Sequence, residues 1–477
     1  MTLRELFAPF GPAFPDVEVR GVTHDSRRVE PGFVYVALPG RRFDGHAFVD
    51  DAVRRGAVAV VGARELRPGV PYLRLPEAEL RPTLARLAAG FYGRPSEKLW
   101  VAGVTGTDGK TTTAFLLRHL LAASGRGTGL IGTVGHDTGA GLVFPEGHFT
   151  TPEAPEVQGL LAEMVAAGLS HAVLESSSHA LAQHRLDAVD FDLAVWTHLS
   201  PEHLDFHGDM EGYFRAKAAL VGRARLAVLN TACPYAMRLV HRPHLSYGPG
   251  GVFELLALHE EAEGLAFAFS SPEGRFQTQL PMLGRYNAEN ALAALAAAYT
   301  AGVNPRKAAE ALPRFGGVPG RMQFVQTEPF RVVVDFAHTP KGLAATLAAL
   351  SPTTRGRLIV VVGSAGERDP AKRAPLGRVA AERAELAVFT EEDSRSEPVE
   401  AILAEMARGA REAGAREGER FWLEPDRERA IGRAFELAEP GDTVVLAGKG
   451  HERTLERARE TLPWNEAALA RRLLGID

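Results

Sequence analysis

The chain has 477 residues, of which 45% are hydrophobic and 24% charged, close to the composition of an average globular protein. At about 100–200 residues per domain this length predicts more than one domain, and we expect three. The formal net charge of −5 excludes the basic character typical of nucleic-acid-binding proteins, so no nucleic acid partner is expected. The single cysteine, Cys233, excludes an intramolecular disulfide and is interpreted as a small buried residue.

The N-terminus, M-T-L-R-E-L-F, lacks the long apolar core of a signal peptide. No apolar run approaches the roughly 20 residues of a membrane span. We therefore expect a soluble cytoplasmic protein with no membrane partner, and a monomer by default.

Short β-branched runs alternate with Ala/Leu-rich helical stretches along most of the chain, which predicts βαβ units and the α/β class. Between residues 20 and 76 the expected strands are short and are broken by turn pairs such as Pro31-Gly32. A helix is expected over 80–92, and G-R-P-S then interrupts the chain. We place the first boundary near residue 97, which makes 1–97 the first domain.

A strand expected over 99–104 leads into a Gly/Thr loop and then a helix over 112–121, as at the start of a mononucleotide-binding sheet. The alanine-rich segment 288–298 is predicted to be a buried helix. After the break F-G-G-V-P-G, the runs R-V-V-V-D-F and L-I-V-V-V-G restart the parallel-strand pattern. A second boundary near Val325 gives a central P-loop domain, 98–325, and a Rossmann-like C-terminal domain, 326–477.

The segment G-V-T-G-T-D-G-K-T has the character of a phosphate-binding loop, because its N–H groups and the following helix N-terminus would face an anion. Lys110 would neutralise phosphate charge and the Thr111 hydroxyl would ligate Mg²⁺. Val104 stands where the usual pattern has its first glycine, and a chance glycine turn is the alternative. The loop alone leaves motors, switches, kinases and ligases open. The residues predicted to hold the nucleotide here are Gly106, Thr107, Asp108, Gly109, Lys110, Thr111 and Thr112.

Two later segments carry polar side chains that could complete such a site. In A-V-L-E-S-S-S-H, Glu175 ends an apolar strand and could ligate magnesium, or could be a carboxylate at a helix N-terminus. The segment L-S-P-E-H-L-D-F-H-G-D-M-E-G-Y-F-R-A-K places His203, Asp205 and His207 close in sequence to Lys217. Histidines of this kind also commonly satisfy core hydrogen bonds, and a lone helical lysine is usually solvated.

Taken in order, the motifs of the chain resemble those of the Mur ligase family. The matching segments are G-T-D-G-K-T-T-T, T-T-P-E-A, E-S-S-S-H-A-L-A-Q-H-R, H-L-D-F-H-G, Y-N-A-E-N, P-G-R-M, V-D-F-A-H-T-P, G-E-R-D-P-A-K-R and A-G-K-G-H-E. The resemblance covers nearly the whole chain, and G-R-M, A-H-T-P and A-G-K-G-H-E favour the MurE type. The segment from V-T-H-D-S-R to R-F-D-G-H resembles the uridine-nucleotide-binding domain that the MurE and MurF types share.

The resemblance implies an ATP-dependent ligase of peptidoglycan synthesis, and so of cell-wall biogenesis, cell shape and cell division. It would add an amino acid to UDP-MurNAc-L-Ala-D-Glu through an acyl phosphate. One Mg²⁺ would lie at Thr111 and Glu175, and a second at His203 and a carbamylated Lys217, since a carbamate is the oxygen donor that Mg²⁺ prefers. The residues given catalytic roles are Lys110, Glu175, His203, Lys217 and His338.

The resemblance also implies nucleotide contacts from Asn290, Arg321 and Asp335. His338 lies in the same region, and capping of a helix before Pro340 is its alternative role. The residues implied to bind the UDP-linked peptide are Ser26, Thr150, Thr151, Ser177, Gln183 and Arg185. The two threonines could instead cap a helix that begins near Pro152.

The acceptor amino acid is where the chain departs from its family. Members that add meso-diaminopimelate carry Asp-Asn-Pro-Arg, whereas the aligned residues here are Glu392, Asp393, Ser394 and Arg395. Asp393 adds an anion and Ser394 removes the fixed φ of proline, so we expect L-lysine or L-ornithine. The alternative, that Arg395 alone still binds meso-diaminopimelate, stays open. Further acceptor positions implied by the resemblance are Arg368, Gly448 and Glu452.

Other functions also remain open from the sequence. A P-loop switch or motor would hydrolyse nucleotide without an acceptor, and a regulator that binds uridine nucleotides would have lost the catalytic residues that this chain keeps. Within the family, MurF-type and folate-polyglutamate ligases are the nearest alternatives, and the first domain argues against the folate enzyme.

Overall fold

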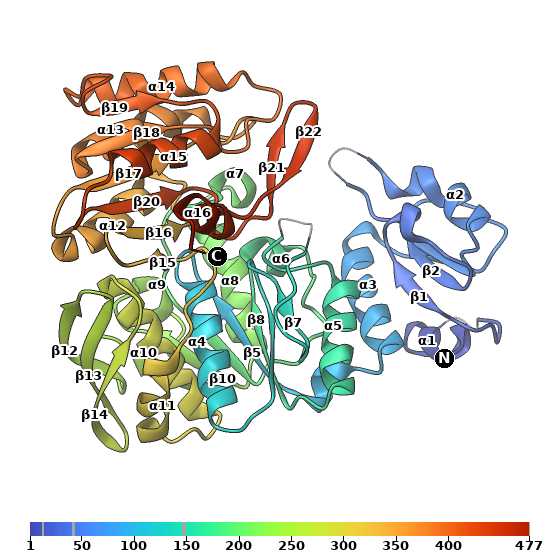
Figure 1. The fold of residues 1–477 in the computed structure, drawn as a ribbon. Coiled ribbons are helices and arrows are strands. Elements are labelled where there is room, and N and C mark those ends of the chain that lie inside the picture. The colour runs from blue at the N-terminus through green and yellow to red at the C-terminus, as the bar shows by residue number, and fades with distance from the viewer. Residues whose placement is uncertain (12–13, 41–42, 146–148, 477) are drawn as a thin grey trace. The chain divides into compact units, whose positions relative to one another are not determined.

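The computed structural model describes residues 1–11, 14–40, 43–145 and 149–476 (Figure 1). The chain forms two compact units. The first contains Met1–Val252 and Ala293–Val303, and the second contains Phe253–Leu292 and Asn304–Asp477. Parallel sheets with helices against them confirm the predicted α/β class.

A small parallel sheet opens the first unit. Its strand order is β1-β2-β3-β4, with β1 Gly21–Thr23, β2 Phe33–Val36, β3 Ala59–Gly62 and β4 Tyr72–Arg74. Its helices are α1 Leu3–Phe7, α2 Val49–Arg54 and α3 Glu77–Phe91. Side chains along a strand alternate between the faces, so Val34 packs in one core with Leu84 of α3, whereas Tyr35 packs in another with Ala52 of α2.

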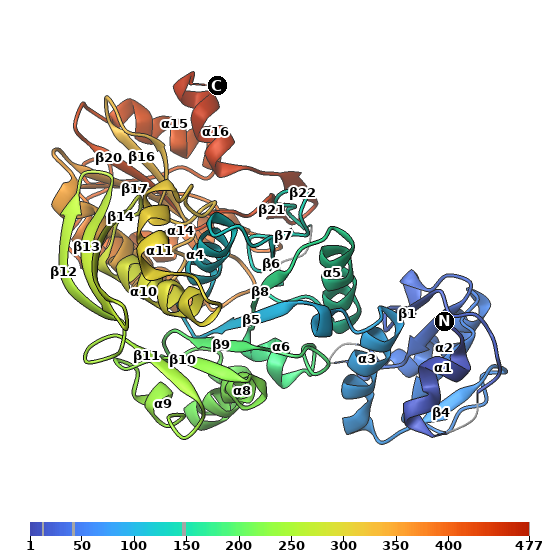
Figure 2. The same cartoon turned by 90° about the horizontal axis from the view of Figure 1, so that it is seen from below.

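A seven-stranded sheet follows in the same unit. Its order is β11-β10-β9-β5-β8-β6-β7, and all neighbours are parallel except β6 and β7. The strands are β5 Trp100–Thr105, β6 Thr128–Ile131, β7 His136–Asp137, β8 His171–Glu175, β9 Leu193–Trp196, β10 Leu226–Asn230 and β11 His244–Tyr247. Figure 2 shows these strands from a second direction. Because β8 and β9 flank β5, the segments that follow these three strands meet at one edge of the sheet.

Helices connect these strands. They are α4 Lys110–Ala123, α5 Ala154–Ala166, α6 Ser178–Ala182, α7 Leu204–His207, α8 Met210–Arg223 and α9 Pro234–Met237. Leu161 of α5 and Leu220 of α8 are buried in the same core as Trp196. The predicted strand, loop and helix at β5 and α4 are confirmed, as is the buried alanine-rich helix, which is part of α10 Arg285–Thr300.

The second unit contains an antiparallel sheet that the sequence did not predict. Its strands are β12 Glu254–Glu261, β13 Gly264–Ser271 and β14 Gly274–Leu280. A six-stranded sheet has the order β15-β16-β20-β17-β18-β19, and only β15 is antiparallel to its neighbour. Its strands are β15 Gln323–Gln326, β16 Arg331–Asp335, β17 Leu358–Val362, β18 Leu386–Phe389, β19 Phe421–Leu423 and β20 Thr443–Ala447.

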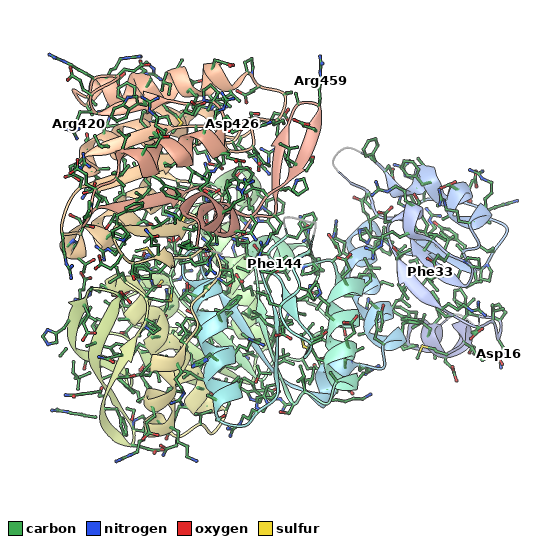
Figure 3. All side chains as sticks on the ribbon, viewed as in Figure 1. Asp16, Phe33, Phe144, Arg420, Asp426 and Arg459 are labelled. Atoms are coloured by element: carbon green, nitrogen blue, oxygen red, sulfur yellow. The ribbon has the colours of Figure 1, made fainter. Side chains whose placement is uncertain are left out.

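Helices and a hairpin complete this unit. The helices are α11 Pro305–Ala311, α12 Pro340–Leu350, α13 Arg373–Arg383, α14 Val399–Glu412, α15 Arg427–Leu437 and α16 Glu466–Leu474. The hairpin is formed by β21 Thr454–Arg457 and β22 Glu460–Pro463, and Arg459 extends from its tip (Figure 3). Among the described residues, no helix combines the length and the apolar character needed to cross a membrane.

The expected domain boundaries can be compared with the sheets. Residue 97 lies in the 3-10 helix Pro95–Lys98, between the first sheet and β5. Val325 lies inside β15, and the residue before it, Phe324, pairs with Val333 of β16. The last sheet therefore starts two residues before the expected boundary, and the three-way division at 97 and 325 stays a prediction.

Candidate active site

The loop between β5 and α4 has the geometry of an anion-binding turn. Gly106 has a φ of +151°, and a Cβ at this position would lie 1.9 Å from Thr197 Oγ1, so only glycine fits. Gly109 takes a left-handed conformation directly before α4 and has no side chain to cap the helix. The first N–H groups of α4 can therefore face a phosphate.

Lys110 and Thr111 lie at the start of α4. Lys110 Nζ donates to the carbonyl oxygens of Gly106 at 3.0 Å and Thr107 at 2.8 Å, which holds the cation over the loop. Thr111 Oγ1 donates to Glu175 Oε2 at 2.8 Å. The Thr111 hydroxyl and the Glu175 carboxylate thus offer two neighbouring oxygen atoms of the kind that would hold Mg²⁺.

Glu175 ends β8 and is fully buried. Thr133, in the loop after β6, donates to it twice, from its backbone N to Oε1 at 2.9 Å and from its hydroxyl to Oε2 at 2.9 Å. Helix α6 is capped by Ser177, whose hydroxyl accepts from the backbone N of Ala180, so Glu175 is not its N-terminal cap. The sequence analysis did not identify Thr133.

Lys217 of α8 is only 1% exposed, unlike a solvated helical lysine. Its Nζ donates to the Gly106 carbonyl oxygen at 2.6 Å and lies 4.8 Å from the centre of the Tyr213 ring. Burial lowers the pKa of Lys217 well below its usual value, and the positive charge of Lys110 lowers it further. The two lysines therefore point at one carbonyl group of the phosphate loop.

His203 lies beside this pair. It precedes α7 with a left-handed backbone, and its ring centre is 4.6 Å from that of His179. Burial, followed by the charges of Lys110 and Lys217, lowers the pKa of His203 to about 4, so the imidazole is neutral at pH 7 and can act as a ligand. No group of three His, Cys, Asp or Glu side chains forms a metal site within the described ranges, so an ion here would need other oxygen donors.

Residues implied to bind the peptide gather on the other side of Glu175. Thr151 Oγ1 donates to the Glu175 carbonyl oxygen at 2.6 Å and accepts from the backbone N of Ser177 at 3.1 Å. Arg185 donates to the Thr151 carbonyl oxygen at 2.8 Å and to Gln183 Oε1 at 2.7 Å. These four predicted residues therefore form one hydrogen-bonded cluster, which is joined to the backbone carbonyl of the residue whose carboxylate faces the phosphate loop.

The remaining peptide-side residues are less closely connected. The Thr150 hydroxyl oxygen lies 3.1 Å from that of Thr133, and Glu153 rather than either threonine lies at the N-cap of α5. Glu153 also pairs with Arg185 at 3.0 Å and with Arg81 of α3 at 3.4 Å. Ser26 is buried at the start of a short turn after β1 whose other two residues are exposed. Glu153 is part of the T-T-P-E-A segment, but its ion pairs with Arg185 and Arg81 were not predicted.

In the second unit, Asp335 ends β16 and accepts three hydrogen bonds. The donors are the backbone N of Met322 at 2.8 Å, the backbone N of Ala337 at 3.0 Å and the Thr346 hydroxyl at 3.0 Å. Burial raises the pKa of the Asp335 carboxyl group. Asp335 therefore orders the loops around it.

Arg321 and His338 both lie against Phe336. The Arg321 guanidinium is 4.4 Å from the centre of that ring, and the His338 ring centre is 4.6 Å from it. Helix α12 is capped by Thr339, so His338 does not cap it. Asn290 in α10 donates to Asn287 at 3.2 Å. Arg321, Asp335 and His338 are thus neighbours within the unit, as their motifs predicted.

The acceptor residues follow β18 and β20. Glu392 is 6% exposed, and burial raises the pKa of its carboxyl group. Gly448 has a φ of +108°, and a Cβ there would lie 2.9 Å from Glu392 Oε2. Asp393 Oδ1 accepts from Lys449 Nζ at 2.7 Å, and Lys449 also pairs with Glu452 at 2.6 Å. The anion added at Asp393 is therefore paired with Lys449, a cation that it shares with Glu452.

Ser394 and Arg395, the last two of the four residues aligned with the family's Asp-Asn-Pro-Arg, differ in environment. Ser394 is buried, whereas Arg395 is partly exposed and has a left-handed backbone. Arg395 Nε donates to Glu456 Oε2 at 2.8 Å, and Arg395 Nη1 donates to the Gly366 carbonyl oxygen at 2.7 Å. Arg368 is exposed in the turn after β17. Neither Lys449 nor Glu456 was among the predicted residues.

The parallel sheet, the glycine loop and the Thr111–Glu175 pair define a P-loop nucleotide-binding protein. Residues 18–92 match the Mur ligase family catalytic domain, residues 104–298 the Mur ligase middle domain, and residues 320–450 the Mur ligase glutamate ligase domain. The UDP-N-acetylmuramyl-tripeptide synthetase of Deinococcus radiodurans is 51% identical over 99% of this chain and 98% of its own length. The chain belongs to the Mur ligase family.

Other relatives agree with this assignment. The UDP-N-acetylmuramoyl-L-alanyl-D-glutamate–2,6-diaminopimelate ligase of Gloeobacter violaceus is 43% identical over 95% of this chain and 94% of its own. A solved structure of a ligase with that name has a TM-score of 0.69 and 30% identity, covering 100% of this chain and 99% of the other. The MurF ligase of Thermotoga maritima in complex with ADP, at 23% identity, shares the fold with a TM-score of 0.64 over 96% of this chain and 97% of its own. The chain thus has the three-domain architecture of an ATP-dependent ligase family.

Proposed function

We propose that the protein adds a basic L-diamino acid, L-lysine or L-ornithine, to UDP-MurNAc-L-Ala-D-Glu in peptidoglycan precursor synthesis. One observation carries the proposal. The Glu175 carboxylate accepts from Thr111 of the phosphate loop, while the Glu175 carbonyl oxygen holds Thr151 of the peptide-side cluster. A nucleotide phosphate bound at the loop and a substrate carboxylate bound at the cluster would therefore both lie next to Glu175. Phosphoryl transfer to a carboxylate requires the two groups to be close in this way.

The reaction proceeds in two steps. A carboxylate oxygen of the substrate attacks the γ-phosphorus of ATP, which breaks the bond to ADP and forms an acyl phosphate. The neutral amine of the acceptor then attacks the acyl carbon, the phosphate leaves, and the amine loses a proton. The first step brings two anions together, and the second develops negative charge on the acyl oxygen and the departing phosphate, so positive charge close to the phosphate contributes most to the rate.

The residues around the phosphate loop have separate tasks in this scheme. Lys110 holds the transferred phosphoryl group, and Gly106 and Gly109 let the backbone approach it. Bound Mg²⁺, held by Thr111 and Glu175 and by His203 and Lys217, would supply charge neutralisation. Arg185, anchored by Thr151 and Gln183 and paired with Glu153, would line the channel for the peptide substrate.

Carbamylation of Lys217 is part of the proposal. A neutral lysine amine adds CO₂ to give a carbamate anion and a proton, and the burial that lowers the Lys217 pKa favours the neutral amine. The product would place oxygen atoms next to Gly106, where an ammonium would repel a metal ion. A cytoplasmic monomer stays the expectation from the sequence.

Glu392 supports an acceptor that carries a side-chain ammonium, as lysine, ornithine and meso-diaminopimelate all do. Its carboxyl group is buried next to Gly448, and Oε2 makes no hydrogen bond in the described structure, so that ammonium would give it a partner. Because Asp393 is paired with Lys449, the added anion is a weaker argument against meso-diaminopimelate than the sequence suggested. The relatives named as 2,6-diaminopimelate ligases make meso-diaminopimelate the second candidate.

The test is phosphate release by the purified protein with ATP, UDP-MurNAc-L-Ala-D-Glu and each of L-lysine, L-ornithine and meso-diaminopimelate. Higher kcat/KM for the two basic amino acids is expected, and L-lysine and L-ornithine should differ by about 1–3 kcal/mol at most, the value of one methylene group. A preference for meso-diaminopimelate would overturn the acceptor assignment. Phosphate release that needs neither peptide nor amino acid would instead indicate a switch or motor.

A further inference from the structure

The hairpin β21–β22 lies against the acceptor loop, which we define as Glu391 to Arg395. Arg395 forms a parallel bridge with Arg457, and its backbone N donates to the Glu456 carbonyl oxygen at 3.1 Å. The hairpin ends at the exposed tip marked by Arg459 (Figure 3). Backbone pairing thus fixes β21 beside the loop in which the chain departs from the family pattern.

Side chains of opposite charge connect the same two segments. Glu391 accepts from Arg457 at 2.6 and 3.0 Å. Asp393 Oδ1 accepts from the backbone N of Glu456 at 2.9 Å. Arg395 donates from Nε to Glu456 Oε2 at 2.8 Å. The acceptor loop and β21 therefore form one charged layer, and Arg395 is part of it.

The guanidinium of Arg395 is engaged along each edge. Nε faces Glu456, Nη1 donates to the Gly366 carbonyl oxygen, and Nη2 lies 3.7 Å from Asp393 Oδ2. A carboxylate is bound most strongly by two parallel N–H groups of one guanidinium edge. Each edge here already includes a nitrogen that faces a protein oxygen, so a ligand carboxylate would have to displace one of them.

We propose that Glu456 determines acceptor specificity by holding Arg395. While the ion pair is closed, Arg395 is not available to a distal carboxylate, and the Glu456 anion repels such a group. A basic diamino acid has no distal carboxylate and is not affected. The inference rests on the acceptor chemistry proposed above for this loop, and it assigns to β21 a role in choosing the acceptor.

The test uses Glu456→Gln, which removes the anion but keeps the backbone N that donates to Asp393. The ratio of kcat/KM for meso-diaminopimelate to that for L-ornithine should rise by at least about tenfold, the effect of one charge-assisted hydrogen bond. The change should lie in the KM for meso-diaminopimelate and leave kcat and the KM for ATP unchanged. Glu460→Gln is the matched control, since Glu460 lies on the same hairpin, is about half exposed and pairs only weakly with Arg457 at 3.5 Å.

A double variant identifies the residue through which Glu456 acts. In Glu456→Gln/Arg395→Gln the tenfold gain should disappear, because the released guanidinium is no longer present. A ratio that stays unchanged in a stably folded Glu456→Gln variant overturns the proposal, as does a gain that persists without Arg395. A wild-type preference for meso-diaminopimelate would refute the acceptor assignment alone, because the change in ratio on substitution is measured independently of the starting preference.

Discussion

Replacing Glu466 by glutamine should strongly destabilise the second unit. Helices α15 and α16 are joined by two ion pairs of different burial. Arg427 and Glu466 are both 0% exposed, with Arg427 Nε at 3.1 Å from each carboxylate oxygen, whereas Arg472 and Glu428 are 60% and 47% exposed. Removing one partner of a buried pair leaves an uncompensated charge and costs about 3–5 kcal/mol, while an exposed pair contributes about 0–1 kcal/mol.

The Arg427–Glu466 pair also positions the backbone next to the acceptor residues. Arg427 donates to the Glu391 carbonyl oxygen at 3.1 Å and to the Ala447 carbonyl oxygen at 2.8 Å, so it joins the ends of β18 and β20. Glu466→Gln should therefore also raise the KM for the acceptor amino acid without changing the KM for ATP.

The assay is urea unfolding followed by tryptophan fluorescence, to which Trp464, one of the four tryptophans, contributes from beside this pair, where it donates to Glu466 at 2.6 Å. Glu428→Gln is the control on the same two helices. The loss of unfolding free energy should be several-fold larger for Glu466→Gln than for Glu428→Gln. Equal losses for the two variants would refute the reasoning from burial.

Three further predictions concern the phosphate loop. Lys110→Ala should abolish phosphate release while binding of the UDP-linked substrate, measured by calorimetry, survives, and near-normal turnover would contradict the assignment. Lys217→Ala should be nearly inactive and regain activity with added short carboxylic acids, whereas an unmodified Lys217 in the intact mass of the active enzyme would count against the carbamate. Gly106→Ala should lower ATP affinity by at least about tenfold, since the new Cβ would meet Thr197 Oγ1; unaltered ATP binding would show that the loop can shift.

The sequence predicted the elements whose cause is local. Strand β5, the glycine loop and α4 were identified because glycines, a strand before them and a helix after them are adjacent in the chain. The end of β8 at Glu175 was identified in the same way. The antiparallel strands β12 and β14 were missed because they are largely exposed, carry mixed polar residues and lack the continuous apolar runs of the parallel sheets. Strand β13 between them does have an apolar run, L-A-F-A-F, and was missed as well.

Partners that are distant in sequence could not be predicted. Glu456 is 61 residues from Arg395, and nothing in its neighbourhood identifies it as an ion-pair partner. Burial could not be predicted either. In the sequence Lys217 has the pattern of an ordinary helical lysine, and only the packing of α8 against the phosphate loop buries it. Only the family resemblance pointed to Lys217 beforehand.

The last prediction concerns Thr133, which lies in the site although no sequence motif pointed to it. Its backbone N and hydroxyl both donate to Glu175, and the hydroxyl shares Oε2 with Thr111. Groups that orient a metal ligand affect metal affinity or activity by about 10- to 100-fold when they are removed. Thr133→Val keeps the shape and the backbone donor but removes the hydroxyl.

The Mg²⁺ concentration for half-maximal activity should therefore rise by about tenfold in Thr133→Val, the lower end of that range, because one donor remains. Thr133→Ser restores the hydroxyl and should return the Mg²⁺ requirement to that of the wild type. The KM for the acceptor amino acid should not change in either variant, since the acceptor residues belong to the other compact unit. An equal Mg²⁺ requirement in the valine and serine variants would show that the backbone N–H alone positions Glu175.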